Sequence, residues 1–370
     1  MLPAARTHRF SLTDVLRNCL EAVCGDRGSL GLPTVDHAVV LLVDGLGTAP
    51  LEAHRAYARR LVAAPKSGVI QSVFPSTTAS ALASLTTGEL PGVHGLVGYL
   101  GFDSSGDRVV NHLTGWGPEL DPGTWQRVPT LFECAKERDV PAFAVGPARY
   151  RDSGFTAAVL RGAEYRPGAT VADRLAEVRG IHAQHARSLT YVYAHEVDAA
   201  AHAKGVGSDR WTAALEEVDA AVAAFAGTLG PRAGLLVTGD HGGLDIPFDD
   251  HVIVDPALLD GVRHVSGEPR CLALHLEPGA DAGEVLARWQ AAEGRRAWIA
   301  TRDEAVAAGF FGDVDRDVLP RIGDVLVAAR ARIAYYLDED DPGRAMVGQH
   351  GSLTPEERDV PLLRFGAFGR

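Results

Sequence analysis

The sequence predicts an α/β fold in which a mostly parallel central sheet is flanked by helices on both faces. Runs of apolar residues at 38–43, 189–193 and 235–237 are typical of strands buried on both faces. Each run leads toward acidic and imidazole side chains, and open α/β sheets place functional sites at such strand ends. The clearest case is Gly-Leu-Leu-Val-Thr-Gly-Asp-His-Gly-Gly at 234–243. Taken alone, that stretch also fits a turn with an Asx hydrogen bond and an exposed histidine.

The first elements alternate between helix and strand. Residues 11–25 predict an amphipathic helix that Ser11 caps and Gly25 ends. The strand at 38–43 then runs into Asp44, and a further short strand is expected at 69–74. Asp44 is followed by glycine, as in a tight turn at the end of a strand.

A cluster of hydroxyl residues opens the next predicted helix, which runs from Pro75 to Gly88. Serine and threonine at a helix start cap free N–H groups, and this is the structural interpretation. The same N–H groups and the helix dipole form an anion site, into which a hydroxyl could point as a nucleophile. The segment by itself leaves both interpretations open.

The middle of the chain places a second pair of candidate ligands. Helices are expected at 170–186 and 208–228, on either side of the strand at 189–193. This strand runs toward Asp198 and His202, which are four residues apart and therefore share one face of a helix. A helix-start acid with a surface histidine is the alternative.

The pattern changes beyond residue 247. It shows an alternating apolar run, a helix and a further strand, expected at 264–276, 281–293 and 324–336. We expect residues 248–345 to form a smaller inserted α+β subdomain. Residues 1–247 and 346–370 would then form the catalytic core, to which His350 belongs.

Composition narrows the class of protein. The chain has 370 residues, of which 46% are hydrophobic, and its 36 basic against 48 acidic residues give a net charge of −12. This charge argues against stable binding to nucleic acid or to an anionic membrane. The four cysteines are scattered, so neither a cysteine metal site nor a disulfide framework is expected. With no signal peptide and no apolar run of membrane-spanning length, we expect a cytoplasmic protein; the oligomeric state is open.

Parallel strands would bring the strand-end residues to one edge of the sheet. The set comprises three carboxylates and three imidazoles, namely Asp44, Asp198, Asp240, His202, His241 and His350. Without a thiolate it suits Zn²⁺, with Mn²⁺ or Fe as alternatives. Six ligands are too many for one zinc, but two ions about 4 Å apart stabilise in-line displacement at phosphorus. Thr78, at its helix start, would be the nucleophile.

The ordered motifs resemble those of the alkaline phosphatase superfamily, within it the type I phosphodiesterase, or nucleotide pyrophosphatase/phosphodiesterase, family. The matching motifs are Val43-Asp44-Gly45, Phe74-Pro-Ser-Thr-Thr78, Thr87-Gly88, Pro91-x-x-His94-Gly95, Asp198-x-x-x-His202, Asp240-His241-Gly242 and His350-Gly351. The resemblance covers roughly 38–245 and 345–365 and implies an alkaline phosphatase-like fold.

The resemblance also implies roles for these residues. One metal is held by Asp44, Asp240 and His241 and contacts Thr78; the other is held by Asp198, His202 and His350. Counting back ten residues from Gly88 gives Thr78 as nucleophile, with Thr77 as the alternative and Ser76 the third choice. The phosphodiesterases usually have an asparagine five residues after the histidine of the His-Gly motif, and here Tyr99 stands there. Its phenol can also donate a hydrogen bond.

The implied activity is that of a two-metal phosphoesterase that hydrolyses phosphodiester or pyrophosphate bonds through a phosphothreonine intermediate. A phosphomonoesterase or phosphomutase on the same metal plan is the alternative, and a metal-binding protein without catalysis is the least favoured. The substrate is a small phosphorylated compound. We expect residues 99–125, residues 150–170 and the inserted subdomain to contact it, but they carry no motif that names it.

Overall fold

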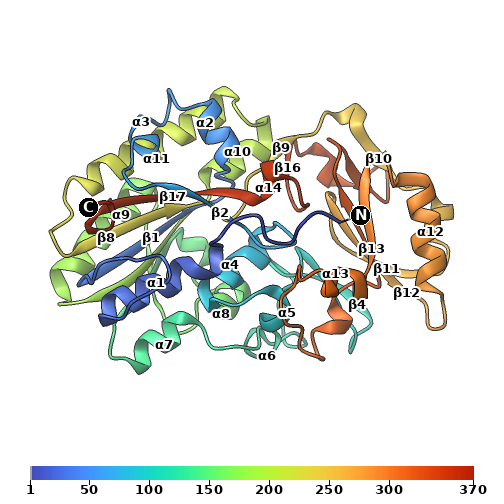
Figure 1. Cartoon of the computed structure of the whole chain (residues 1–370), viewed down its shortest axis with the longest axis horizontal. Helices are drawn as coiled ribbons and strands as arrows, with labels where there is room; N and C mark the ends of the chain where they lie inside the picture. The colour runs from blue at the N-terminus through green and yellow to red at the C-terminus, as the bar shows by residue number, and fades with distance from the viewer. Residues whose placement is uncertain (1) are drawn as a thin grey trace.

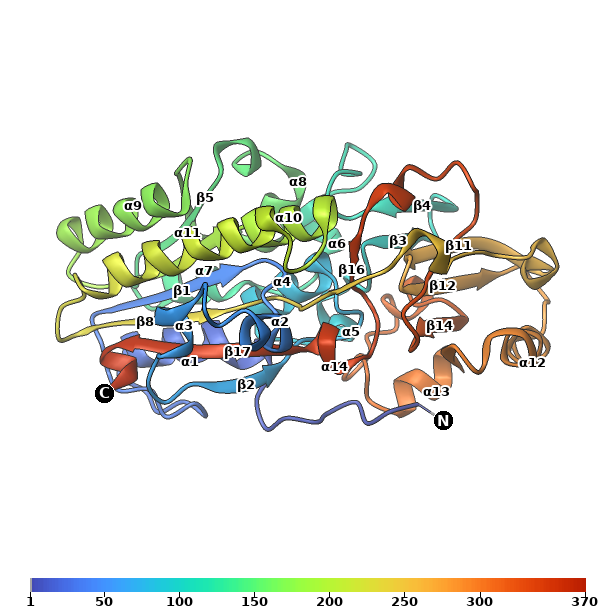
Figure 2. The ribbon, with the colours of Figure 1, turned by 90° about the horizontal axis from the view of Figure 1, so that it is seen from above.

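The computed structural model describes residues 2–370 and has two sheets at opposite ends of an elongated molecule (Figures 1 and 2). The larger has seven strands in the order β2-β17-β8-β1-β7-β5-β6. Their bounds are β1 His37–Val43, β2 Gly68–Gln71, β5 Ala142–Gly146, β6 Glu164–Pro167, β7 Ser188–Ala194, β8 Ala233–Thr238 and β17 Asp359–Gly366. The strands from β8 to β6 run parallel and β17 is antiparallel to both its neighbours, which confirms the mostly parallel sheet.

Helices cover both faces of this sheet, as the continuous apolar runs predict. Along β1, Ala38, Val40 and Leu42 pack in one core with residues of α1, α4 and α7. Val39, Leu41 and Val43 pack in a second core on the opposite face, with residues of α9, α10 and α11. The bounds are α1 Leu12–Cys24, α4 Thr78–Thr87, α7 Leu131–Glu137, α9 Val171–Gln184, α10 Glu196–Lys204 and α11 Asp209–Ala226. Each strand residue is thereby buried whichever way its side chain points.

Shorter helices complete this end of the molecule. They are α2 Thr48–Ala53, α3 Arg59–Val62, α5 Pro91–His94, α6 Pro122–Trp125, α8 Gly154–Val159 and α14 Pro355–Arg358. The predicted helix ends are correct for α1, where Ser11 is the N-cap and Gly25, with φ of 82°, is the C-cap.

The second sheet has six strands in the order β13-β14-β12-β11-β3-β4. Four come from the expected insertion: β11 Val262–Glu268, β12 Cys271–Leu276, β13 Ala297–Thr301 and β14 Val325–Ala329. The other two, β3 Leu100–Asp103 and β4 Arg108–Asn111, come from the first half of the chain. Helices α12 Ala282–Glu293 and α13 Arg302–Ala307 accompany this sheet (Figure 1). We propose that residues 248–345 form an inserted subdomain, to whose sheet the β3–β4 hairpin adds.

One strand prediction was wrong in its extent. Residues 324–336 form two strands, β14 and β15 (Ala334–Tyr336), because the chain turns between them, where the Arg330 and Ala331 N–H groups both donate to Arg296 O. β15 then pairs with β10 (His251–Ile253), outside the six-stranded sheet. Two short strands, β9 Leu244–Asp245 and β16 Gly348–Gln349, form a separate pair. Over residues 2–370, no helix is long and apolar enough to cross a membrane.

Candidate active site

The strand ends that carry the candidate ligands meet at one edge of the larger sheet. Val43 at the end of β1 is in register with Ala194 at the end of β7, and Leu42 pairs with Thr238 at the end of β8. Residues just beyond these ends therefore emerge side by side. The backbone at residue 45 lies so close to Asp198 that only glycine fits: a Cβ on Gly45 would lie 2.9 Å from the Asp198 Cβ. The φ of 72° at Gly45 also favours glycine.

The first group of side chains, which we call the buried cluster, comprises Asp44, Thr78, Asp240 and His241. Nε2 of His241 lies 3.4 Å from Asp44 Oδ1, 3.3 Å from Asp240 Oδ2 and 3.2 Å from Thr78 Oγ1. The side chains of Asp240 and His241 are 0% exposed. The structure thus brings together four residues that span almost two hundred positions of the chain.

In each carboxylate of the buried cluster, one oxygen accepts hydrogen bonds from the protein and the other accepts none. Asp240 Oδ1 accepts the N–H groups of Gly45 and His241, both at 3.0 Å, and Asp44 Oδ2 accepts the Tyr193 hydroxyl. Within residues 2–370, Asp44 Oδ1 and Asp240 Oδ2 have no hydrogen-bond partner. These two free oxygens are the atoms that face His241 Nε2.

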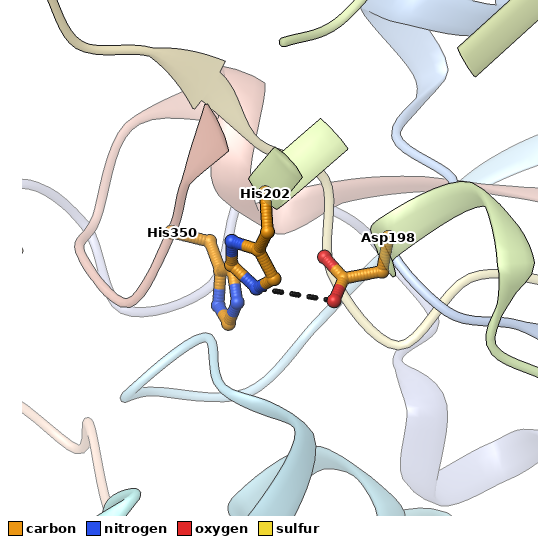
Figure 3. A group of neighbouring side chains, drawn as sticks. All are labelled: Asp198, His202 and His350. Atoms are coloured by element: carbon orange, nitrogen blue, oxygen red, sulfur yellow. Dashed lines mark ion pairs between the residues drawn. The ribbon is translucent and has the colours of Figure 1, made fainter. Parts of the chain in front are cut away.

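The second group, which we call the open cluster, comprises Asp198, His202 and His350 (Figure 3). Their ligand atoms all lie within 4.8 Å of one another, and Asp198 Oδ2 is 3.1 Å from His202 Nε2. Asp198 also lies within that distance of Asp44 and His241, so it adjoins both clusters. The open cluster is only half-buried, since it draws on α10 and the turn after β16 instead of the central strands.

All three histidines are oriented in the same way. Nδ1 of His202 donates to Gly348 O at 2.7 Å, that of His241 to Gly242 O at 2.9 Å, and that of His350 to Ser76 O at 2.9 Å. In the neutral form of each ring the proton lies on Nδ1, so Nε2 is the nitrogen that offers a lone pair. Metal-binding histidines are fixed by their other nitrogen in this manner.

The concentration of charge perturbs the acids and bases of both clusters. Burial, together with the charges of Asp240 and Asp198, raises the pKa of Asp44 well above its usual range. Burial also raises the pKa of Asp240. In the open cluster burial lowers the pKa of His202, but the Asp198 carboxylate outweighs it and raises that pKa to about 8. Two buried carboxylates, with the half-buried Asp198 beside them, need compensating positive charge.

These observations fit divalent cations. Two ligand atoms of the same zinc ion, each about 2.0–2.1 Å from the metal in tetrahedral geometry, lie about 3.3 Å from each other. The separations of 3.2–3.4 Å in the buried cluster match this spacing. The free oxygens, the free nitrogens and the excess of negative charge all agree with metal binding.

Comparison with known proteins gives the family. Residues 38–353 match the family described as Type I phosphodiesterase / nucleotide pyrophosphatase, which is most of the chain. The chain belongs to this family. Membership supports hydrolysis of phosphoesters and agrees with the resemblance found in the motifs. No curated protein sequence matches the chain.

Solved structures of the family and its neighbours share the fold. Phosphonoacetate hydrolase from Sinorhizobium meliloti 1021, in complex with phosphonoformate, is 20% identical with a TM-score of 0.70, over 90% of this chain and 91% of that one. An inactive variant of murine ectonucleotide pyrophosphatase/phosphodiesterase 5, in complex with AMP, is 16% identical with a TM-score of 0.67, over 89% and 88%. The human protein is 16% identical with a TM-score of 0.68, over 89% and 87%. At these identities the likeness shows an alkaline phosphatase-like fold.

The hydroxyl residues at the start of α4 were predicted to act either as helix caps or as a nucleophile, and their contacts differ. Thr77 is the N-cap by position, but its side chain makes no capping hydrogen bond. Thr78 is the first residue of α4 and its hydroxyl faces His241. Ser76 is buried and donates to Ser352 O at 2.7 Å. Of the three, Thr78 is the one whose hydroxyl faces the buried cluster.

Tyr99 is anchored through its backbone. Its N–H donates to Glu268 Oε2 at 3.1 Å, and its carbonyl accepts the His112 N–H at 2.9 Å. Its hydroxyl makes no hydrogen bond to any residue in the described range 2–370, so its role as a phosphate donor stays a prediction.

Sequence reasoning missed Tyr193. Two of the segments that it expected to contact the substrate, 99–125 and 150–170, contribute to a cavity beside Thr78. This cavity has a volume of about 430 Å³, and its lining comes mainly from 113–116 and 144–165. Within residues 2–370, none of the lining residues belongs to the expected insertion. Tyr193 was detectable as a tyrosine near the end of β7, five residues before Asp198, although only the fold shows that its hydroxyl reaches Asp44.

Proposed function

We propose that the chain is a two-metal phosphoesterase that hydrolyses phosphodiester or pyrophosphate bonds through a phosphothreonine intermediate on Thr78. One observation carries this proposal: the Thr78 hydroxyl lies 3.2 Å from His241 Nε2, within the cluster that also holds two free carboxylate oxygens. A nucleophile among metal ligands is the arrangement needed for displacement at phosphorus.

The proposed metals are two divalent cations, with zinc favoured and Mn²⁺ or Fe as alternatives. Asp44, Asp240 and His241, with the Thr78 oxygen, would hold one, and Asp198, His202 and His350 the other. When bound, such cations supply positive charge that stabilises the attacking and leaving oxygens.

We propose that residues of the chain carry out the two displacement steps at phosphorus. Thr78 Oγ forms a bond to phosphorus while the bond from phosphorus to the leaving oxygen breaks, so the other organic group stays on a phosphothreonine. Water then attacks the same phosphorus, and Thr78 is released with a phosphomonoester as product. The N–H groups of Thr78 and Ala79, at the start of the ten-residue helix α4, would donate to the phosphoryl oxygens. We propose Tyr99 as a further donor.

The known neighbours support phosphorus substrates of several kinds. The murine protein was solved with AMP and the bacterial hydrolase with phosphonoformate. The murine inactive variant carries a threonine-to-alanine substitution, which is consistent with a threonine nucleophile. A panel of diesters, pyrophosphates, phosphonates and monoesters is therefore the appropriate substrate set.

The decisive experiment measures 4-nitrophenolate release from bis(4-nitrophenyl) phosphate by zinc-loaded protein. Thr78→Ala should lower kcat at least on the order of a thousandfold, because the nucleophile is lost. Thr77→Ala, a matched control next to it, should stay within a few-fold of wild type. Chelation should abolish the activity and zinc should restore it.

Contrary outcomes are equally clear. A fully active Thr78→Ala protein, or hydrolysis that survives chelation, would refute the proposal. If Thr77→Ala lost activity and Thr78→Ala did not, the nucleophile would be Thr77. Faster turnover of 4-nitrophenyl phosphate than of the diester would favour the monoesterase or mutase alternative. Metal binding without turnover of any panel member would indicate a protein that has lost catalysis.

A further inference from the structure

The cavity that reaches Thr78 has the size of an ordinary ligand site. Its volume of about 430 Å³ falls within the range of small-molecule pockets. Aromatic side chains make up much of its wall, namely Trp116, Tyr150, Phe155, Tyr165, Tyr191 and Tyr193. An organic group of the substrate, bonded to the phosphorus that Thr78 attacks, would occupy this space.

Arg149 is the only charged side chain that lines the cavity within residues 2–370. Tyr150 holds its guanidinium, with Cζ 4.6 Å from the ring centroid and Nη2 donating to the hydroxyl at 2.9 Å. In the described part of the chain no carboxylate forms an ion pair with Arg149. Arg161, Arg166 and Arg174 pair with Glu133, Glu164 and Glu196. Arg151 is exposed and, like the exposed Arg149, forms no ion pair within residues 2–370, but it does not line the cavity.

The unpaired charge is not explained by a shortage of acids, since acidic residues outnumber basic ones by 48 to 36. Its place in the cavity follows from a chain of contacts. The Tyr150 and Tyr193 ring centroids are 6.0 Å apart, and the Tyr193 hydroxyl donates to Asp44. These contacts connect Arg149, an exposed residue of the cavity lining, through Tyr150 and Tyr193 to Asp44 of the buried cluster.

We propose that Arg149 binds a second anionic group of the substrate, separate from the phosphoryl group that Thr78 attacks. A carboxylate or a second phosphate has the required chemistry, since guanidinium donates two parallel hydrogen bonds to either. Within residues 2–370 the lining offers a cationic group no carboxylate, and the charge of Arg149 would repel it. A choline-like substituent held by cation–π contacts with the aromatic wall is the competing outcome that the test includes. This inference rests on the proposed function, because it assumes that the ester is attacked at Thr78.

The test compares substrates that differ only in the second charge. Phenyl 4-nitrophenyl phosphate and its 3-carboxyphenyl counterpart share a leaving group, and the ratio of their kcat/KM values isolates the carboxylate. Arg149→Gln should lower this ratio about tenfold, as expected for a charge-assisted hydrogen bond that is partly exposed, with the phenyl ester unaffected. Arg151→Gln is the matched control, since Arg151 lies in the same loop, is exposed and does not line the cavity.

A second arm separates the two sources of negative charge. Hydrolysis of diphenyl pyrophosphate, followed as phenyl phosphate, should fall in Arg149→Gln if Arg149 binds a second phosphate. Loss only with the carboxyphenyl ester assigns a carboxylate on the organic group, and loss only with the pyrophosphate assigns the second phosphate. No dependence on Arg149 in either arm overturns the inference, as does fastest turnover of 4-nitrophenyl phosphorylcholine.

Calorimetry separates this inference from the proposed function. If Thr78→Ala is inactive, both diesters can be titrated into it intact, and Arg149→Gln in that background should reduce the preference for the carboxyphenyl ester about tenfold. An unchanged preference overturns the inference while the function stands. If Thr78→Ala stays active, the proposed function fails, and the kinetic ratio still decides the role of Arg149.

Discussion

Two groups of histidines near the active site use their nitrogens differently. His202, His241 and His350 each donate Nδ1–H to a backbone carbonyl and leave Nε2 among carboxylates. His94 and His112, both 0% exposed, have both nitrogens bonded within the scaffold. We propose that an Nε2 atom facing carboxylate oxygens distinguishes the candidate ligands from the scaffold histidines, whereas burial alone does not.

The scaffold histidines hold segments around the site in place. His94 accepts the Leu96 N–H at 3.1 Å, so its Nε2 donates to Ser84 of α4 at 2.9 Å. His112 donates to Gly98 O at 2.7 Å and accepts the Trp125 indole N–H at 3.0 Å. His94 lies in the family-like His-Gly motif, yet it supports α4 through Ser84 and does not belong to either cluster.

The largest expected effect separates the two groups directly. His241→Gln should lower kcat/KM on the diester at least on the order of 10²–10³-fold, because it removes a group on which the proposed site depends. Metal content by mass spectrometry should fall by one equivalent. His94→Gln is the matched control and should keep both metals and most of the activity per folded molecule. Equal metal loss in both variants would contradict the comparison.

The next largest expected effect is the dependence of folding stability on pH that His112 contributes. Burial lowers the pKa of His112 to about 4 from an ordinary value of 6.5. Between these values the unfolded chain binds a proton that the folded chain does not, so the free energy of unfolding falls as pH falls. His112 should contribute on the order of 3 kcal/mol of loss from pH 7 to pH 4.

Urea unfolding at several pH values measures this contribution. His112→Gln, whose amide can keep both hydrogen bonds, should show a shallower loss of stability toward acid than wild type. Identical pH slopes for the two proteins would show that His112 does not titrate as its burial requires.

The smallest effect concerns the hydroxyl that orients Asp44. Tyr193→Phe should lower metal affinity or activity by about 10–100-fold, since groups that orient metal ligands have effects of this size. Tyr165→Phe is the control, because Tyr165 lines the same cavity but donates to Pro147 O instead. Competition with a chelator measures the affinity, and equal behaviour of the two variants would exclude a role for the Tyr193 contact.

The sequence predicted the central strands of the larger sheet well because they carry a local signal, but it did not predict the edge strand β6 (Glu164–Pro167), whose residues form no apolar run. Consecutive apolar residues in β1 and β8 reflect burial on both faces, and Ser11 and Gly25 delimit α1 by their caps. The prediction of one continuous strand was wrong at 330–333, because the turn between β14 and β15 contains no glycine or proline that would indicate it. The sequence also could not predict that β3 and β4 join the second sheet, since that pairing joins Leu100 to Gly267.

The sequence by itself determined the residue types of the site, their order and their family, because motif spacing is a local property of the chain. Only the tertiary structure decided which oxygen of Asp44 and Asp240 is free, which histidines face carboxylates, and that Arg149 forms no ion pair with any acid of the described residues 2–370. These properties depend on distances between segments as far apart as Asp44 and Asp240. Such distances are set by strand register and side-chain packing, which no short stretch of sequence encodes.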